Sequence, residues 1–416
     1  METAAGVGAD ASVPPKSMIK HWTPAVVLMF CVVLAFFDKI SIAVLFADPV
    51  FQDTMGIAQD RAKAGWLMTS FLLAYGFSSI FLSFLGDLFN PKRVLFWSVV
   101  SWGVLMLIMG MTYTYEGMLV NRILLGIAEG PLFALCYSIV KQRFTEKEQA
   151  RASTMFILGT PIGAALGFPI TAYVLQNYDW HTTFYVMGVL TLIMSIFVVI
   201  GLRDVVIVKT ERIQKAAQKA AHKINVKVLA SNPAFWIICV FNISLMTYLW
   251  GLNSWIPTYL IEEKGFNLKS FGMLSSIPFI SMLVGEILGA FYSDKFFHHA
   301  RAKQVFLGLF VAGVAMYFMT VASGVAMVIL AMSISSMFWG VAVSAVFPLL
   351  GQVCTKETAT TAGGIFNGLG NFGSALAPVL IGYIVTFSGN FNNGIYFLAL
   401  VAVIGSLLLV TVIKRY

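Results

Sequence analysis

Long runs of apolar residues, separated by short polar turns, dominate the chain. A helix needs roughly 20 mostly apolar residues to cross the hydrocarbon core of a membrane, whereas a β-barrel strand shows a shorter segment of alternating polarity. The runs span residues 22–46, 62–85, 94–114, 118–140, 152–176, 183–202, 233–260, 271–292, 304–322, 326–350, 360–386 and 393–413. The pattern therefore predicts an all-α membrane protein with twelve transmembrane helices.

The composition strengthens this prediction and excludes several function classes. Hydrophobic residues make up 59% of the 416 positions and charged residues only 11%, against about 25% charged in ordinary soluble domains. The four cysteines lie far apart inside apolar runs, so we interpret them as reduced packing residues. The sequence has no zinc-ligand spacing, phosphate-binding loop or nucleophile motif. We therefore expect no enzymatic activity, no metal and no cofactor.

The distribution of positive charge predicts the topology. Alternate loops, together with both chain ends, hold 21 of the 27 Lys and Arg residues, while the opposite loops hold four. Short loops rich in Lys and Arg stay in the cytoplasm, so both termini are expected there. The net charge of +8 follows from this loop bias, and we do not take it as a sign of nucleic-acid binding.

One long polar stretch, "RDVVIVKTERIQKAAQKAAHKINVKVLASNP", divides the chain. We predict a cytoplasmic tail at 1–21, a six-helix bundle at 22–203, a cytoplasmic linker at 204–231 and a second six-helix bundle at 232–416. After both the second and the eighth runs, an acidic residue at the helix end is followed by a turn rich in basic residues, as expected of an internal repeat. Their charged residues are candidates for cytoplasmic gating: Asp87, Arg93 and Asp294.

Four charged residues interrupt the apolar runs; we expect Asp38, Lys39 and Glu129 near mid-membrane and Arg122 nearer the outer end. Asp38 and Lys39 are adjacent in the first run, and Arg122 and Glu129 lie seven residues apart in the fourth. Each costs on the order of 3 kcal/mol at the centre of a membrane helix, so such residues usually face a protein interior or a wet cavity. Neighbours one residue apart point in different directions, whereas a spacing of seven places two residues on one face. We therefore expect Asp38 and Lys39 to find partners on another helix, with the fourth run as the obvious supplier.

This set of charges suggests a way to couple an anion to a proton. The proton affinity of a buried carboxyl group depends on whether a neighbouring cation is free or occupied by an anionic ligand. We therefore assign Lys39 and Arg122 to substrate binding and Asp38 and Glu129 to proton coupling. The alternative is a buried ion network that only fixes helix packing.

Further polar and aromatic residues are candidates for the lining of a substrate cavity. Asn367 and Asn371 lie one helical turn apart in the eleventh run and offer a hydrogen-bonding face. The other candidates, each of which is also explained by ordinary packing or interfacial anchoring, are Tyr75, Tyr248, Trp250 and Asn253. Glu286 is another intramembrane acid, and the sequence does not assign it a role.

Several segments together resemble the anion:cation symporter family of the major facilitator superfamily, which includes galactonate and hexuronate transporters, sialin and the vesicular glutamate transporters. These segments are "RILLGIAEGPLFA", "NPAFW", "SWIPTYL" and "GGIFNGLGNFGSALAPVLIGYIV". The resemblance implies a fold of two six-helix bundles and proton-linked movement of organic anions by alternating access. It also implies functional roles for Asp38, Lys39, Tyr75, Arg122, Glu129 and Asn371.

Two departures from the family pattern affect the expected substrate. Lys39 stands where arginine is usual, and a lysine ammonium is a point charge without the planar fork that grips a carboxylate through two bonds. Thr160, which we include among the substrate-binding candidates, stands where glutamine is common in sugar-acid carriers. These departures leave room for an aromatic or short-chain carboxylate.

The sequence as a whole predicts a proton-coupled importer of a small organic anion. We expect a monomeric multi-pass protein of a bacterial plasma membrane, with the anion, protons and the lipid bilayer as its partners. An anion exchanger or exporter on the same fold is the nearest alternative, and a receptor or scaffold that does not transport is another. The identity of the anion, the proton stoichiometry and the direction of transport stay open.

Overall fold

Helices form nearly all of the structure. The computed structural model describes residues 18–82, 89–144, 146–202, 229–297, 300–354 and 359–413. The helices before the linker are α1 (Met18–Leu45), α2 (Pro49–Met55), α3 (Arg61–Phe81), α5 (Pro91–Gly110), α6 (Tyr115–Glu129), α7 (Leu132–Arg143), α8 (Glu146–Ile157), α9 (Gly159–Asn177) and α10 (Trp180–Gly201). Those after it are α12 (Pro233–Thr258), the π-helix η1 (Tyr259–Glu263), α13 (Leu268–Leu274), α14 (Ser276–Lys295), α15 (Arg301–Val321), α16 (Val325–Val353), α17 (Ala359–Ser374), α18 (Ala377–Ser388), α19 (Phe391–Leu408) and α20 (Val410–Ile413).

The described residues contain eleven spans that are long and apolar enough to cross a membrane. Helix α3 supplies the twelfth predicted crossing. Its 21 residues reach about 30 Å at 1.5 Å per residue, which matches the hydrocarbon thickness, and it packs against α6 and α18. The short helix α2, which follows the first crossing, was not predicted.

Four of the crossings are interrupted. The fourth, fifth, eighth and eleventh crossings are each built from two helices, namely α6 and α7, α8 and α9, α13 and α14, and α17 and α18. A proline has no N–H to donate, and its ring clashes with the carbonyl four residues earlier. In three of these crossings the first helix ends four residues before a proline: Ile157 before Pro161, Leu274 before Pro278, and Ser374 before Pro378. Hydropathy alone does not show such breaks.

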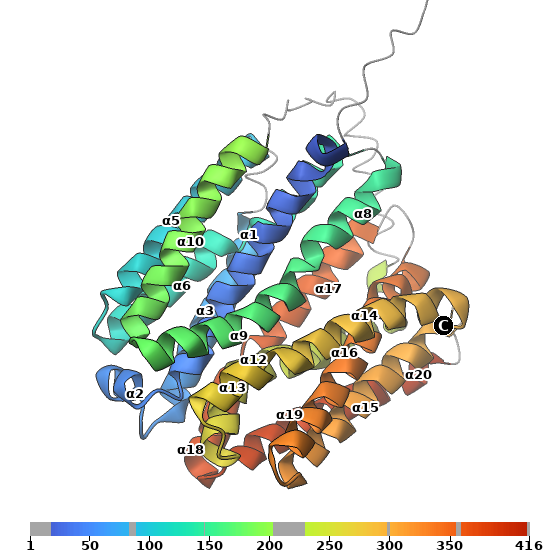
Figure 1. Ribbon diagram of the computed structural model, residues 1–416. Coiled ribbons are helices and arrows are strands. Elements are labelled where there is room, and N and C mark those ends of the chain that lie inside the picture. Colours follow the sequence, from blue (N-terminus) through green and yellow to red (C-terminus); the bar gives the residue numbers. More distant parts are fainter. Residues whose placement is uncertain are drawn as a thin grey trace, which may run out of the picture.

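The helices form two bundles that repeat one packing pattern (Figure 1). In the first half α5 packs on α10, α3 on α6, and α1 on both α9 and α10. In the second half α15 packs on α19, α14 on α16, and α12 on both α17 and α19. The halves meet where α3 contacts α18, α9 contacts α14 and α1 contacts α12. This equivalence is what an internal repeat of six crossings produces.

An ion pair joins the two halves at the end of the molecule that carries α2. Arg61 donates to Glu262 at 2.8 Å, and the amide of Gln52 donates to the same carboxylate at 3.1 Å. The backbone N–H of Arg61 also donates to the hydroxyl of Thr386 at 3.1 Å. These contacts join the two halves at this end.

Parts of several predictions lie outside the described residues. These parts are the tail before residue 18, the lysine-rich segment between residues 203 and 228, and Asp87. The cysteines fit their predicted role as free packing residues, since Cys31, Cys136 and Cys239 are buried and Cys354 is half-buried.

Glycines allow α6 to approach α3 closely. A Cβ atom added to Gly126 would lie 2.9 Å from the backbone nitrogen of Tyr75 and would also meet the carbonyl of Phe71. One added to Gly130 would lie 2.7 Å from the carbonyl oxygen of Tyr75. Real Cβ atoms do not approach backbone this closely, so the α3–α6 contact requires glycine at these two positions.

We predict that Gly126→Ala destabilises the protein by about 1–3 kcal/mol, the usual cost of overpacking a tight contact. Thermal unfolding in detergent measures this. Gly351→Ala on α16 is the matched control, because its added Cβ meets nothing within 4 Å. If the two variants melted at the same temperature, the close contact between α3 and α6 would be refuted.

Candidate functional site

The four charged residues predicted to lie at membrane depth gather inside the first half. Their side chains are nearly inaccessible: Asp38 is 1% exposed, Lys39 2%, and Arg122 and Glu129 0%. Asp38 interacts electrostatically with each of the other three. We call Asp38, Lys39, Arg122 and Glu129 the charge cluster. None of its members faces the lipid.

Lys39 pairs with Glu129 across α1 and α6. The ammonium nitrogen lies 3.5 Å from Oε2 of the carboxylate. It also lies 4.0 Å from the centre of the Tyr75 ring on α3. A cation over an aromatic face is stabilised by the ring quadrupole, and the effect grows when water is excluded. The fourth run therefore supplies the partner of Lys39, as predicted, and Tyr75 belongs to the same group.

Arg122 is held mainly by α3. Its Nε donates to the carbonyl of Leu67 at 3.1 Å, and Nη2 donates to the sulfur of Met68 at 3.4 Å. The guanidinium carbon lies 4.4 Å from the centre of the Phe71 ring. These contacts fix the side chain while none of them neutralises its charge.

Asp38 differs from the prediction, because its hydrogen-bond partner does not come from the fourth crossing. The hydroxyl of Thr191 on α10 donates to Oδ2 of Asp38 at 3.2 Å. Asp38 and Lys39 are adjacent on one helix, so one side chain points toward α10 while the other points toward α6.

Helix α10, which carries Thr191, begins at a side-chain cap. The carboxylate of Asp179 accepts the backbone N–H of Thr182 at 2.7 Å. This hydrogen bond holds the pKa of the Asp179 carboxyl below its usual value. The cap satisfies one of the free N–H groups of the first turn and fixes where the helix starts.

The break between α6 and α7 lies directly beside Glu129. Serine side chains satisfy the carbonyls that lose their helical partners here. Ser78 of α3 donates to the carbonyl of Ile127 at 2.6 Å, and Ser98 of α5 donates to that of Ala128. Glu129, the last residue of α6, is thereby held at a fixed depth between neighbouring helices.

Several atoms of the charge cluster have no hydrogen-bond partner among the described residues. They are Oδ1 of Asp38, Nη1 of Arg122 and both carboxylate oxygens of Glu129, of which Oε2 lies 3.5 Å from the Lys39 ammonium. Buried polar groups are nearly always paired, so unpaired ones point to a ligand, a proton or water. The cluster has two cations and two carboxylates and can exchange one internal partner for an anion or a proton.

The candidates on α12 divide between two environments. Tyr248 lies inside the second half, where its hydroxyl oxygen is 2.5 Å from that of Ser335, which in turn donates to Ala312. Trp250 lies where the halves meet, with its ring 5.6 Å from that of Phe36 on α1. Asn253 is 1% exposed, and neither of its amide atoms has a partner among the described residues.

The remaining candidates have the following positions and contacts. Asn371 donates to the side-chain oxygen of Asn367 at 3.1 Å, so the two amides bind each other. Thr160 is half-buried near the start of α9. Arg93 is exposed at the start of α5, and Asp294 is the penultimate residue of α14.

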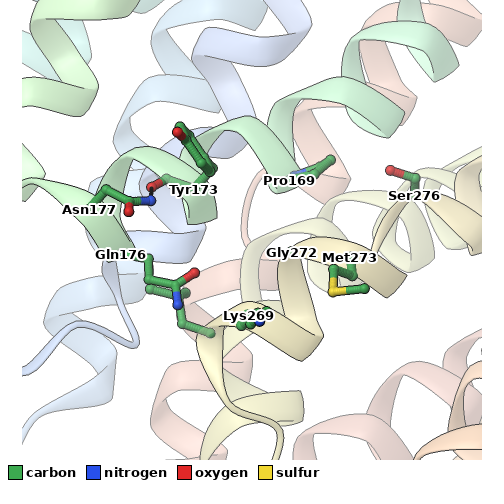
Figure 2. A pocket seen from close by; sticks show the side chains of 9 residues that line it. Pro169, Tyr173, Gln176, Asn177, Lys269, Gly272, Met273 and Ser276 are labelled. Carbon is green, nitrogen blue, oxygen red and sulfur yellow. Dashed lines mark hydrogen bonds between the residues drawn. The ribbon is translucent and has the colours of Figure 1, made fainter.

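Two surface pockets do not coincide with the charge cluster. One of about 620 Å³ lies between α9 and the α13–α14 pair, where Tyr173 and Gln176 face Lys269 and Met273 across the boundary of the halves (Figure 2). None of the predicted site residues lines it. A second pocket of about 1220 Å³ on α5 and α6 includes Arg93 among exposed apolar side chains such as Trp97.

Five side chains that contact the charge cluster were not among the predicted site residues. They are Phe36, Met68, Phe71, Phe133 and Thr191. Phe36 precedes Lys39 by three residues on α1, so helical spacing was an available signal for this contact. Nothing in the sequence indicated that Thr191 would reach Asp38, because the two lie 153 residues apart.

The ion pair between Lys39 and Glu129 predicts a coupled effect on stability. Lys39→Met or Glu129→Leu alone should lower the free energy of unfolding by about 3–5 kcal/mol, because each leaves an uncompensated buried charge. The double variant should be more stable than either single variant. Thermal unfolding of the four proteins measures the coupling. Additive losses would contradict the pairing.

Comparison with known proteins places the chain in a family. The chain is 26% identical to the probable galactarate/D-glucarate transporter GudP of Escherichia coli (strain K12), over 98% of this chain and 97% of that protein. It is 23% identical to the hexuronate transporter of Bacillus subtilis (strain 168), over 95% of each. Both relatives are named as transporters, and the activity of this chain is transport rather than catalysis.

A solved structure shows the same fold. A bacterial homologue of the human lysosomal transporter Spinster, in an inward-facing and unoccupied conformation, matches with a TM-score of 0.79 over 96% of each chain at 16% identity. The family model described as Major Facilitator Superfamily matches residues 28–378. With twelve crossings in two equivalent bundles and a family match over most of its length, this multi-pass membrane protein belongs to the Major Facilitator Superfamily.

Proposed function

We propose that the protein is a proton-coupled symporter of a small organic anion and works by alternating access. The observation that carries this proposal is the charge cluster, in which Lys39 lies 3.5 Å from Glu129 and all four side chains are at most 2% exposed. The named relatives support the choice of an organic anion, since galactarate, glucarate and hexuronate are all organic acids.

Charge balance supplies the coupling. The two cations and two carboxylates of the cluster sum to zero when all are ionised. An anion that binds to Lys39 or Arg122 brings an uncompensated negative charge into a medium where charges are costly. A proton on Glu129 or Asp38 restores the balance and frees the cation from its internal partner. Anion and proton therefore favour each other's binding.

Alternating access provides the route to these buried residues. The contacts of Arg61 with Glu262 and Thr386 close the outer end in the conformation described here. Movement of one bundle against the other exposes the site first to one side and then to the other. A neutralised cluster lowers the cost of this movement because no net charge crosses the bundle interior.

The remaining assignments follow from this cycle. We assign proton coupling to Asp38 and Glu129 and gating to Asp87, Arg93 and Asp294. The anion-binding residues in this proposal are Lys39, Tyr75, Arg122, Thr160, Tyr248, Trp250, Asn253, Asn367 and Asn371. Tyr75 and Trp250 are the best supported of the uncharged members, because Tyr75 contacts Lys39 and Trp250 lies between the halves.

The cellular setting is part of the proposal. The protein acts as a monomer in a bacterial inner membrane, with the bundles at 22–203 and 232–416 joined by a cytoplasmic linker at 204–231. The His21 ring nitrogen Nε2 lies 3.0 Å from the Glu148 carboxylate, so the starts of α1 and α8 share one end of the molecule. Arg61 and Glu262 share the other end. This grouping agrees with the loop sets that predict cytoplasmic termini.

Glu129→Gln should separate anion exchange from proton-driven accumulation. The amide keeps the size of the side chain and cannot take up a proton, so exchange of external for internal anion should continue while accumulation on a pH gradient is lost. Transport of radiolabelled anion into proteoliposomes, with and without an imposed gradient, measures both activities.

Lys39→Ala is the companion variant, which should lose anion binding and therefore both activities. Accumulation on a pH gradient by Glu129→Gln would remove that residue from the coupling mechanism. If the wild-type protein exchanged anion but did not accumulate it on a pH gradient, the protein would be an anion exchanger. Binding without any movement of anion would identify a receptor or scaffold.

A further inference from the structure

We propose that the anion carried is an aromatic monocarboxylate rather than a polyhydroxylated sugar acid. This inference rests on the proposed function and names the substrate class of the same site. It follows from the side chains that surround the substrate-binding cation, Lys39.

Three aromatic rings surround the Lys39 ammonium. It lies 4.0 Å from the ring centre of Tyr75, 5.9 Å from that of Phe36 and 6.0 Å from that of Phe133. A carboxylate that binds this ammonium must therefore place the rest of its molecule against rings. Flat aromatic bodies gain from offset and edge-to-face packing on such rings.

The rings continue away from Lys39 in two directions. Phe36 meets Trp250 of the second half with 5.6 Å between ring centres, and Phe133 meets Phe156 at 6.1 Å. Phe36, Trp250 and Phe156 are almost fully buried, whereas Phe133 is half-buried and so is the most accessible of them. The path from the cation toward the second half is therefore aromatic.

Hydrogen-bonding groups for a sugar acid are few among the candidate residues. The Tyr248 hydroxyl is engaged by Ser335, and the Asn371 amide by Asn367. Asn253 keeps both amide atoms unpaired, and it follows Trp250 by three residues on the same helix. Its amide has two N–H donors and one acceptor oxygen, whereas a sugar acid presents several hydroxyl groups. Each further hydroxyl that is buried without a partner costs about 1–3 kcal/mol.

The charge cluster also favours a single carboxylate. Glu129 occupies Lys39, while Arg122 is fully buried and fixed by Leu67 and Met68 of α3. A monocarboxylate needs one proton to restore neutrality, and release of Lys39 from Glu129 supplies the cation it binds. A diacid needs Arg122 as a second cation and a second proton to restore neutrality.

Binding to the purified protein tests the inference. The probes are benzoate, propionate and glucarate, which represent the aromatic, short aliphatic and polyhydroxylated classes. Thermal shift gives their relative affinities, and exchange in proteoliposomes confirms which are carried. We expect benzoate to bind at least about tenfold more tightly than glucarate, equivalent to about 1.4 kcal/mol.

Ring-removing variants test the contacts themselves. Phe133→Leu and Phe36→Leu should each lower the affinity for benzoate by about tenfold. The affinity for propionate should fall clearly less, because the loss of a ring contact affects only an aromatic ligand. Phe310→Leu is the matched control, since Phe310 is a half-buried ring on α15 that stacks on Phe306. It should leave the ratio of the two affinities unchanged.

The outcomes separate this inference from the proposed function. Tighter binding and transport of glucarate would overturn the aromatic class while leaving organic-anion symport intact. If Phe133→Leu and Phe36→Leu lowered the affinities for benzoate and propionate by the same factor, the two rings would have no part in substrate recognition. Failure of every carboxylate to bind would instead overturn the proposed function.

Discussion

The ion pair between Lys39 and Glu129 is the constraint on which the rest of this structure depends. Two charges at membrane depth are stable only if each has a partner, and the partner must come from another helix. The pair therefore fixes the relation of α1 to α6, and Tyr75 extends it to α3. Asp38 ties the same helix to α10 through Thr191. One charged dipeptide on α1 thus organises contacts with three neighbouring helices.

The surrounding helices are shaped to make this arrangement possible. Gly126 and Gly130 bring α6 against α3, and the interruption after Glu129 holds the acid at a fixed depth. Ser78 and Ser98 satisfy the carbonyls that the interruption exposes. These contacts fix the positions of the backbone segments that carry the charge cluster.

Hydropathy and charge were sufficient to predict the class of fold, because the membrane imposes helix length and loop charge directly. The positions of helix ends were harder, since breaks depend on prolines such as Pro161 and Pro378 inside apolar runs. The pairing of Lys39 with Glu129 was predictable from the cost of isolated charges. The bond from Thr191 to Asp38 was not, because a single threonine in an apolar run carries no signal of its distant partner. The contact of Phe133 with Lys39 also needed the structure, since aromatic residues are common throughout membrane helices.

The central claim is that an anion and a proton enter the charge cluster together. Proton uptake on anion binding tests it most directly, through a pH indicator in weakly buffered detergent solution to which a transported carboxylate is added. The account predicts uptake of about one proton per anion bound, as the neutral sum of the cluster requires. Saturating anion binding with no change in free proton concentration would contradict it.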